Sequence, residues 1–120
     1  TISHMTFAET LTFYDWTGNY TVWVSGFAVV IPMNLSQNSI NVGGEIATSG
    51  IKTYINGTLS LNGQVLSGLI TNDFGYSGQF QFKMKENMNQ LQGNDTEPGS
   101  VEPLCAARNG SGKPSPCMWP

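Results

Sequence analysis

Side chains that commonly carry chemistry are sparse in this 120-residue sequence. Its two cysteines, Cys105 and Cys117, lie either side of a glycine- and proline-containing segment that can close a loop easily. A metal site needs more ligands than two cysteines and no CxxC spacing is present, so the pattern favours a disulfide. A disulfide in turn indicates an oxidising compartment.

Groups for acid–base or nucleophilic catalysis are also scarce. The single histidine, His4, belongs to residues 1–5, which look like a cloning remnant. Thr6 would then begin a mature segment whose targeting signal was left off. Asp15 and Asp73 stand alone near predicted turns, where such residues usually cap the turn, and Glu45 is expected on a solvated outer face. The sequence therefore predicts no catalytic residue, no metal and no cofactor.

Composition excludes two classes of partner. Lys and Arg number only five, the net charge is −3 and no basic cluster occurs, so the footprint of a nucleic-acid-binding protein is missing. The longest apolar run, residues 27–33, is too short to span a membrane and contains Pro32.

The segment from Tyr54 to Thr71 sets the register of the predicted fold. Asn62-Gly63 lies between two alternating runs and predicts a two-residue type I′ turn with both residues at positive φ. Counting outward from this turn places one apolar face inward. The inward pairs are Leu61 with Gln64, Leu59 with Leu66, Gly57 with Gly68, and Ile55 with Ile70.

Two further hairpins follow the same logic. A strand from Phe27 to Leu35 is expected to turn at Gln37-Asn38, with Met33 opposite Val42, and Pro32 is expected at an edge or a bulge. A third hairpin turns at residues 86–89 and places Leu91 opposite Met84 and Gly93 opposite Phe82. Residues 7–16 are either a short first strand or an arm laid across the end of the sheet.

Inward glycines recur along these hairpins, at Gly44, Gly68 and Gly93, and mark strands that bend sharply. Their spacing suits one strand pair per repeat. The prediction is an all-β, antiparallel up-and-down meander over residues 6–93, closing into a barrel of about seven or eight strands. Residues 94–120 are predicted to form an irregular Pro-rich tail, which reduction of the disulfide would loosen without affecting the barrel.

Several motifs resemble a known family. The run Trp16-x-Gly-x-Tyr20, the run Asn62-Gly-x-x-Leu-Ser-Gly68 and the run Ser77-Gly-x-Phe-x-Phe-x-Met84 are similar to those of small lipocalin-like (calycin-type) barrels from secreted and surface proteins of archaea and bacteria. The resemblance covers residues 16–93 and implies the same barrel. Avidin is a more distant relative in barrel size, but the polar residues that hold its ligand have no clear counterparts here.

The inner face is expected to be almost wholly apolar, so any ligand inside would be hydrophobic and held by shape. Aromatic and aliphatic side chains would line such a site, although in a small barrel they more often simply fill the interior. The candidate lining residues are Trp16, Tyr20, Phe27, Ile31, Met33, Phe80, Phe82 and Met84.

Glycosylation sequons occur more often than chance predicts. Asn34 and Asn56 fall on the outer face, where a glycan would not disturb the core. The acceptor asparagines are Asn19, Asn34, Asn56, Asn94 and Asn109.

These features predict a secreted or cell-surface protein. The favoured hypothesis is a non-catalytic binding or structural module with a surface partner protein, and the alternative is a carrier of a small hydrophobic ligand. A shape-templating barrel enzyme is a distant third hypothesis. A carrier should contain an internal cavity of several hundred Å³, on the order of usual ligand pockets.

Overall fold

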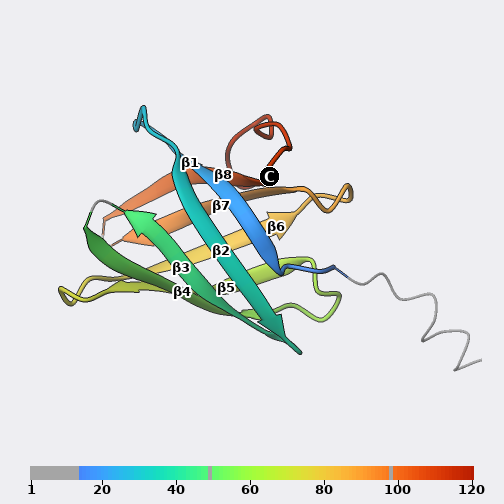
Figure 1. Cartoon of the computed structure of the whole chain (residues 1–120), viewed down its shortest axis with the longest axis horizontal. Coiled ribbons are helices and arrows are strands. Elements are labelled where there is room, and N and C mark those ends of the chain that lie inside the picture. Colours follow the sequence, from blue (N-terminus) through green and yellow to red (C-terminus); the bar gives the residue numbers. More distant parts are fainter. Residues whose placement is uncertain (1–13, 49, 98) are drawn as a thin grey trace, which may run out of the picture.

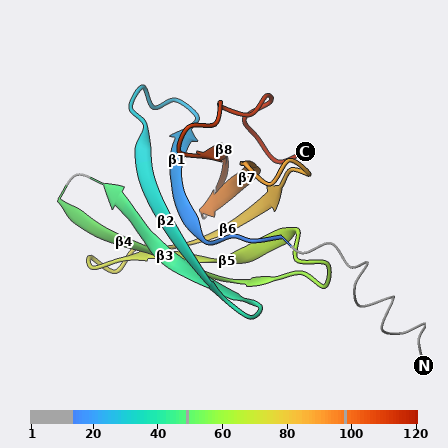
Figure 2. The ribbon, with the colours of Figure 1, turned by 45° about the vertical axis from the view of Figure 1, so that its right-hand side comes forward.

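Eight antiparallel strands over residues 14–48, 50–97 and 99–120, the part of the chain that the computed structural model describes, close into one barrel. Each strand pairs with its neighbours in sequence, and the last pairs with the first (Figures 1 and 2). The predicted fold class is confirmed. The strands are β1 (Gly18–Val24), β2 (Ile31–Asn38), β3 (Asn41–Thr48), β4 (Ile51–Leu59), β5 (Val65–Asn72), β6 (Ser77–Met84), β7 (Gln90–Glu97) and β8 (Ser100–Arg108).

The β4–β5 hairpin has the register predicted from its turn. Leu59 pairs with Leu66, Gly57 with Gly68 and Ile55 with Ile70. The turn itself differs: only Gly63 has a positive φ, of 77°, while the Asn62 side chain accepts a hydrogen bond from the Gln64 N–H at 3.0 Å. Leu61 is fully exposed, because the loop carries it away from the core.

The β2–β3 hairpin corrects a predicted turn. The chain turns at Ser39-Ile40, with Ser39 at a φ of 60°, so Met33 pairs with Ile46 and not with Val42. The pairing is shifted by four positions, an even number, so Met33, Leu35 and Val42 stay on the inner face, whereas Ile40, expected opposite Leu35, lies in the turn and is exposed. The Gln37 side-chain amide donates to the Ser39 carbonyl at 3.1 Å, which stabilises this turn. Pro32 pairs with Thr21 of β1 but lies beyond the last residue of β2 that pairs with β3.

The β6–β7 hairpin is as predicted, with Met84 opposite Leu91 and Phe82 opposite Gly93. The predicted irregular tail from residue 94 is wrong, because β7 continues to Glu97 and residues 100–108 form β8. Pro103, one of the prolines that favoured an irregular tail, is accommodated within β8. Pro103 lies opposite Asn94 of β7. Its neighbour Leu104 is the last β8 residue that pairs with β1. Pro103 therefore lies outside the β1–β8 ladder, and its missing N–H leaves no gap in that ladder.

Inner-face glycines allow adjacent strands to approach closely. A Cβ atom added at Gly68 would lie 1.9 Å from the Asn56 carbonyl oxygen, and one at Gly44 would lie 1.8 Å from that of Asn34. At Gly93 the corresponding distance, to the Gln81 carbonyl oxygen, is 2.1 Å. These contacts involve backbone atoms, so a side chain would force the strands apart, as expected where a barrel bends.

One end of the barrel is capped by residues 14–17, and we call it the Trp16 end. Trp16 is fully buried, and its indole N–H donates to the Gly63 carbonyl at 2.8 Å. The Tyr20 hydroxyl donates to the Trp16 carbonyl, and the Arg108 guanidinium binds the carbonyls of Asp15 and Thr17 while lying 5.1 Å from the centre of the Tyr20 ring. Residues 14–16 thus form the predicted arm across the barrel end, while residues 7–13 lie outside the described part.

Residues 109–120, here called the C-terminal strap, cross the outer face of β8 and β7 (Figure 1). The predicted disulfide between Cys105 and Cys117 is present, with a Cα–Cα distance of 4.9 Å. The Gln92 side-chain amide donates to the Pro116 carbonyl at 2.7 Å, and that of Gln90 donates to the Gly112 carbonyl at 2.8 Å. The strap is therefore attached to the barrel wall at several points.

Candidate functional site

The predicted lining residues fill the barrel. Trp16, Tyr20, Phe82 and Met84 are almost completely inaccessible to solvent, and Met33 and Phe80 are also buried. Ile31 is partly buried and packs against the same cluster. Phe80 and Phe82 contact each other, with ring centres 5.8 Å apart. These side chains belong to one continuous hydrophobic core.

Phe27 is the exception, and its assignment to the inner face is wrong. Residues 25–30 form the exposed β1–β2 connection, in which Phe27 is 64% exposed and Val29 is 66% exposed. The Phe27 N–H donates to the Val24 carbonyl at 3.0 Å, so the chain turns directly after β1. Sequence alternation alone could not detect this, because Phe27 and Val29 continue the period of β2.

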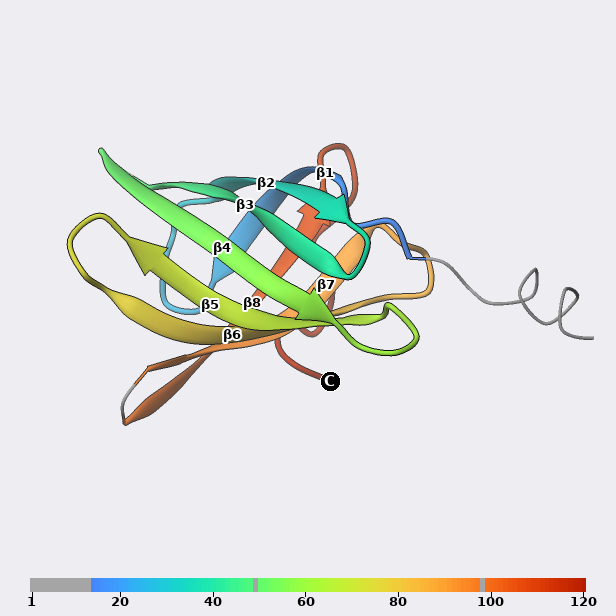
Figure 3. The same cartoon turned by 90° about the horizontal axis from the view of Figure 1, so that it is seen from below.

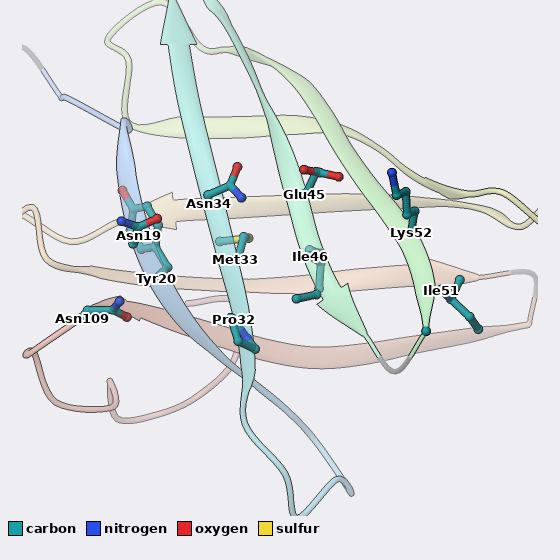
Figure 4. A pocket seen from close by; sticks show the side chains of 12 residues that line it. Asn19, Tyr20, Pro32, Met33, Asn34, Glu45, Ile46, Ile51, Lys52 and Asn109 are labelled. Carbon is teal, nitrogen blue, oxygen red and sulfur yellow. The ribbon is translucent and has the colours of Figure 1, made fainter.

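Shallow hollows lie on the outer surface of the barrel. One of about 500 Å³ extends across β1 to β4, as Figure 4 shows. Asn34 and Glu45 pair across its floor, and Lys52 lies at its margin. Two others, over β2 to β5 and over β5 to β7, are bordered mainly by amide and hydroxyl side chains.

The sequon asparagines all lie on the outside. Asn19, Asn34, Asn56 and Asn109 are exposed, and Asn94 is partly exposed. Asn19 pairs directly with Asn34, and the Thr21 hydroxyl donates to the Asn109 side chain at 3.2 Å. These placements leave each position compatible with a glycan, and whether any is used stays a prediction.

The end of the barrel opposite Trp16 carries inward-facing carboxylates, and we call it the acidic end. Asp95 of β7 pairs directly with Glu102 of β8, and Glu97 lies two residues along on the same face. Thr53 of β4 is also buried inside. The expectation of an almost wholly apolar inner face is therefore wrong at this end. The alternation Leu91, Gly93, Asp95 and Glu97 predicts the placement once β7 is extended past residue 93.

Electrostatic conditions at the acidic end are unfavourable for ionised groups. Asp95 Oδ1 is buried and has no hydrogen-bond partner among the described residues. Burial raises the pKa of the Asp95 carboxyl, and the negative charges of Glu97 and Glu102 raise it further. Burial also raises the pKa of Tyr76 to about 12, with added contributions from the charges of Asp95 and Glu97 and from a hydrogen bond to Glu97.

Replacing Asp95 with asparagine should stabilise the protein at neutral pH. A raised pKa in the folded state means that protonation stabilises the fold at acid pH, and that this stability is lost as the pH rises through the folded-state pKa. Asp95→Asn removes the charge that faces Glu97, Glu102 and Tyr76. We expect a higher melting temperature than wild type at pH 7 and a difference that shrinks toward pH 4.

Thermal denaturation from pH 4 to 8 measures this difference. Glu86→Gln, in the exposed β6–β7 turn at the other end, is the matched control and should show no comparable gain. A melting temperature for Asp95→Asn that falls below wild type at pH 7 would contradict the electrostatic account.

The acidic end thus offers carboxylates and a phenol that can bind a cation or a hydrogen-bond donor. Among the described residues, no group of three or more His, Cys, Asp or Glu side chains is placed to hold a metal ion. Among residues 14–48, 50–97 and 99–120, no helix is long and apolar enough to cross a membrane. Comparison with known proteins finds no family model that matches the chain and no curated sequence that matches it.

Proposed function

We propose that this protein is a non-catalytic secreted or cell-surface module that binds its partner on its outside and not within the barrel. The eight-stranded antiparallel barrel is compatible with a lipocalin-like fold. We include a relation to the small secreted lipocalin-like barrels in the proposal. The barrel architecture and the sequence motifs described above support this relation.

The observation that carries this proposal is the filled interior. The residues that would line a ligand cavity pack against one another from Trp16 at one end to Ile70 near the other. A carrier of a drug-sized ligand requires a pocket of roughly 300–1,000 Å³ inside the barrel. The hollows described above, including the one of about 500 Å³, lie instead on the outer surface.

The disulfide supports the proposed location. Cys105 and Cys117 are bonded, which is consistent with an extracellular environment. The outward placement of the sequon asparagines agrees with passage through a secretory pathway. Secretion remains part of the proposal.

Titration with apolar probes tests the proposal against the carrier hypothesis. A fatty acid and a fluorescent naphthalene dye would be added separately during thermal denaturation of the wild-type protein. A ligand at 100 times its dissociation constant stabilises the folded state by about 2.7 kcal/mol, so binding inside the barrel would raise the melting temperature clearly. We expect no such rise. A saturable rise with either probe, lost in Phe82→Trp, would favour a carrier.

A further inference from the structure

Several exposed apolar side chains lie in or beside the loops at the acidic end. The β1–β2, β3–β4, β5–β6 and β7–β8 connections all lie at this end, as Figure 3 shows. Phe74 is 79% exposed and Phe27 is 64% exposed, and both lie in these connections. Several large exposed apolar side chains at one end of a protein are a common sign of an interaction surface. The other exposed apolar side chains at this end are Val29, Val30, Ile51 and Val101.

The carboxylates inside this apolar rim are only partly compensated by the described residues, because Glu97 has a hydrogen bond with Tyr76 whereas one oxygen of Asp95 has no partner. Asp95 and Glu102 are directly opposite each other on neighbouring strands, an arrangement of like charges that destabilises a sheet. Asp95 Oδ1 is buried without a hydrogen-bond partner. Arg108 lies at the Trp16 end, where it binds backbone carbonyls. Lys52 lies near the acidic end, beside the β3–β4 connection, but it alternates with the buried Thr53 and therefore lies on the outer face. A cation supplied by a partner would remove this electrostatic cost.

We propose that the acidic end docks a polypeptide segment in which a lysine or arginine side chain is flanked by apolar residues. The apolar flanks would contact the loop residues Phe27 and Phe74, and the cationic group would lie against Asp95 and Glu102. This inference rests on the proposed function and names the partner class that such a module binds.

The negative charge of the acidic end distinguishes among the partners that could bind this surface. A second copy docked end to end would bring two sets of carboxylates together, which costs free energy. An anionic bilayer surface would be repelled for the same reason. A metal ion alone would make no use of the apolar rim. A basic, apolar peptide satisfies both the carboxylates and the exposed phenylalanines.

The experiment uses a random 12-residue peptide library displayed on phage and selected against the immobilised wild-type protein. The best selected peptide is then synthesised, and its affinity is measured by calorimetry. We expect selected peptides to contain lysine or arginine between apolar residues. Replacing that basic residue with glutamine should weaken binding about tenfold, the usual scale for a hydrogen bond to a charged group.

Protein variants test both parts of the surface. Asp95→Asn combined with Glu102→Gln should weaken binding about tenfold, and Phe27→Ser combined with Phe74→Ser should weaken it similarly. Phe27 and Phe74 are exposed, so the fold should survive their replacement. The control pair, Asp15→Asn with Glu86→Gln, changes exposed carboxylates outside the acidic end and should leave affinity unchanged.

Selection of no peptide, of peptides without a basic residue, or of peptides that bind the acidic-end variants as tightly as wild type would overturn the inference. These outcomes are separable from failure of the proposed function. Stabilisation by an apolar probe inside the barrel would refute the proposed function whatever the peptide result. Peptides that bind elsewhere on the outer surface would refute only the inference.

Discussion

Trp16→Ala should lower the free energy of unfolding by about 3–5 kcal/mol, the range for removal of a large buried aromatic side chain. Trp16 is fully buried, and its ring closes one end of the barrel. Its indole N–H donates to Gly63, and its backbone N–H donates to the Gln37 side chain at 2.9 Å. The substitution removes packing and leaves the Gly63 carbonyl without this partner. Urea denaturation followed by circular dichroism measures the loss.

Two further variants separate these contributions. Trp16→Phe keeps most of the volume but removes the indole N–H, so it should cost less, about 1 kcal/mol for one hydrogen bond plus a packing term. Trp119→Ala removes a partly exposed indole from the C-terminal strap and serves as the matched control. If Trp16→Ala cost no more than Trp119→Ala, residues 14–17 would not cap the barrel in the manner described.

Removing the disulfide should destabilise the whole protein by about 2–4 kcal/mol. The sequence alone predicts a smaller effect, confined to an irregular tail. The structure changes this expectation because Cys105 is buried in β8, in the barrel wall, and Gln92 of β7 also holds the strap. We expect Cys105→Ala with Cys117→Ala to lower the urea midpoint while keeping a single unfolding transition.

Limited proteolysis provides the complementary measurement. The strap of the double alanine variant should become cleavable, because beyond the Asn109 N–H, which donates to the Asn19 carbonyl at its start, the Gln90 and Gln92 side chains are then its main hydrogen bonds to the barrel. The wild-type protein and the control variant Ser115→Ala, which changes an exposed residue of the strap and keeps the disulfide, should remain resistant to cleavage. Cleavage of the strap with an unchanged urea midpoint would contradict the prediction and would show that the strap and the barrel unfold independently.

Turn chemistry and alternation predict most of the fold. Asn62-Gly63 sets the β4–β5 register correctly even though Asn62 does not adopt positive φ, because the inward pairing of Leu59 with Leu66 constrains the alignment. The β2–β3 turn is misplaced because Ser39 adopts positive φ, which is uncommon outside glycine. The alternation still keeps Met33 and Val42 inside.

The candidate site is harder to predict. The prolines and the scarcity of apolar residues after residue 93 suggest an irregular tail, so the inward direction of Asp95 and Glu102 is missed. Their proximity depends on the pairing of β7 with β8. The Pro98-Gly99 pair between Glu97 and Ser100 is a turn signal that could have predicted this hairpin, but the surrounding prolines favour an irregular tail instead. Likewise, Phe27 continues the alternation of β2, and only the structure shows that the chain turns away before it.

Amide chemical-shift mapping by NMR tests the central claim most directly. The selected basic peptide would be titrated into the ¹⁵N-labelled wild-type protein. The account predicts that the largest shift changes occur in the loops around Phe27 and Phe74 and next to Asp95 and Glu102, while amides of core residues such as Leu66 and Met84 change little. The largest changes at Leu66, Met84 and their core neighbours would contradict the account, because they would place the ligand inside the barrel.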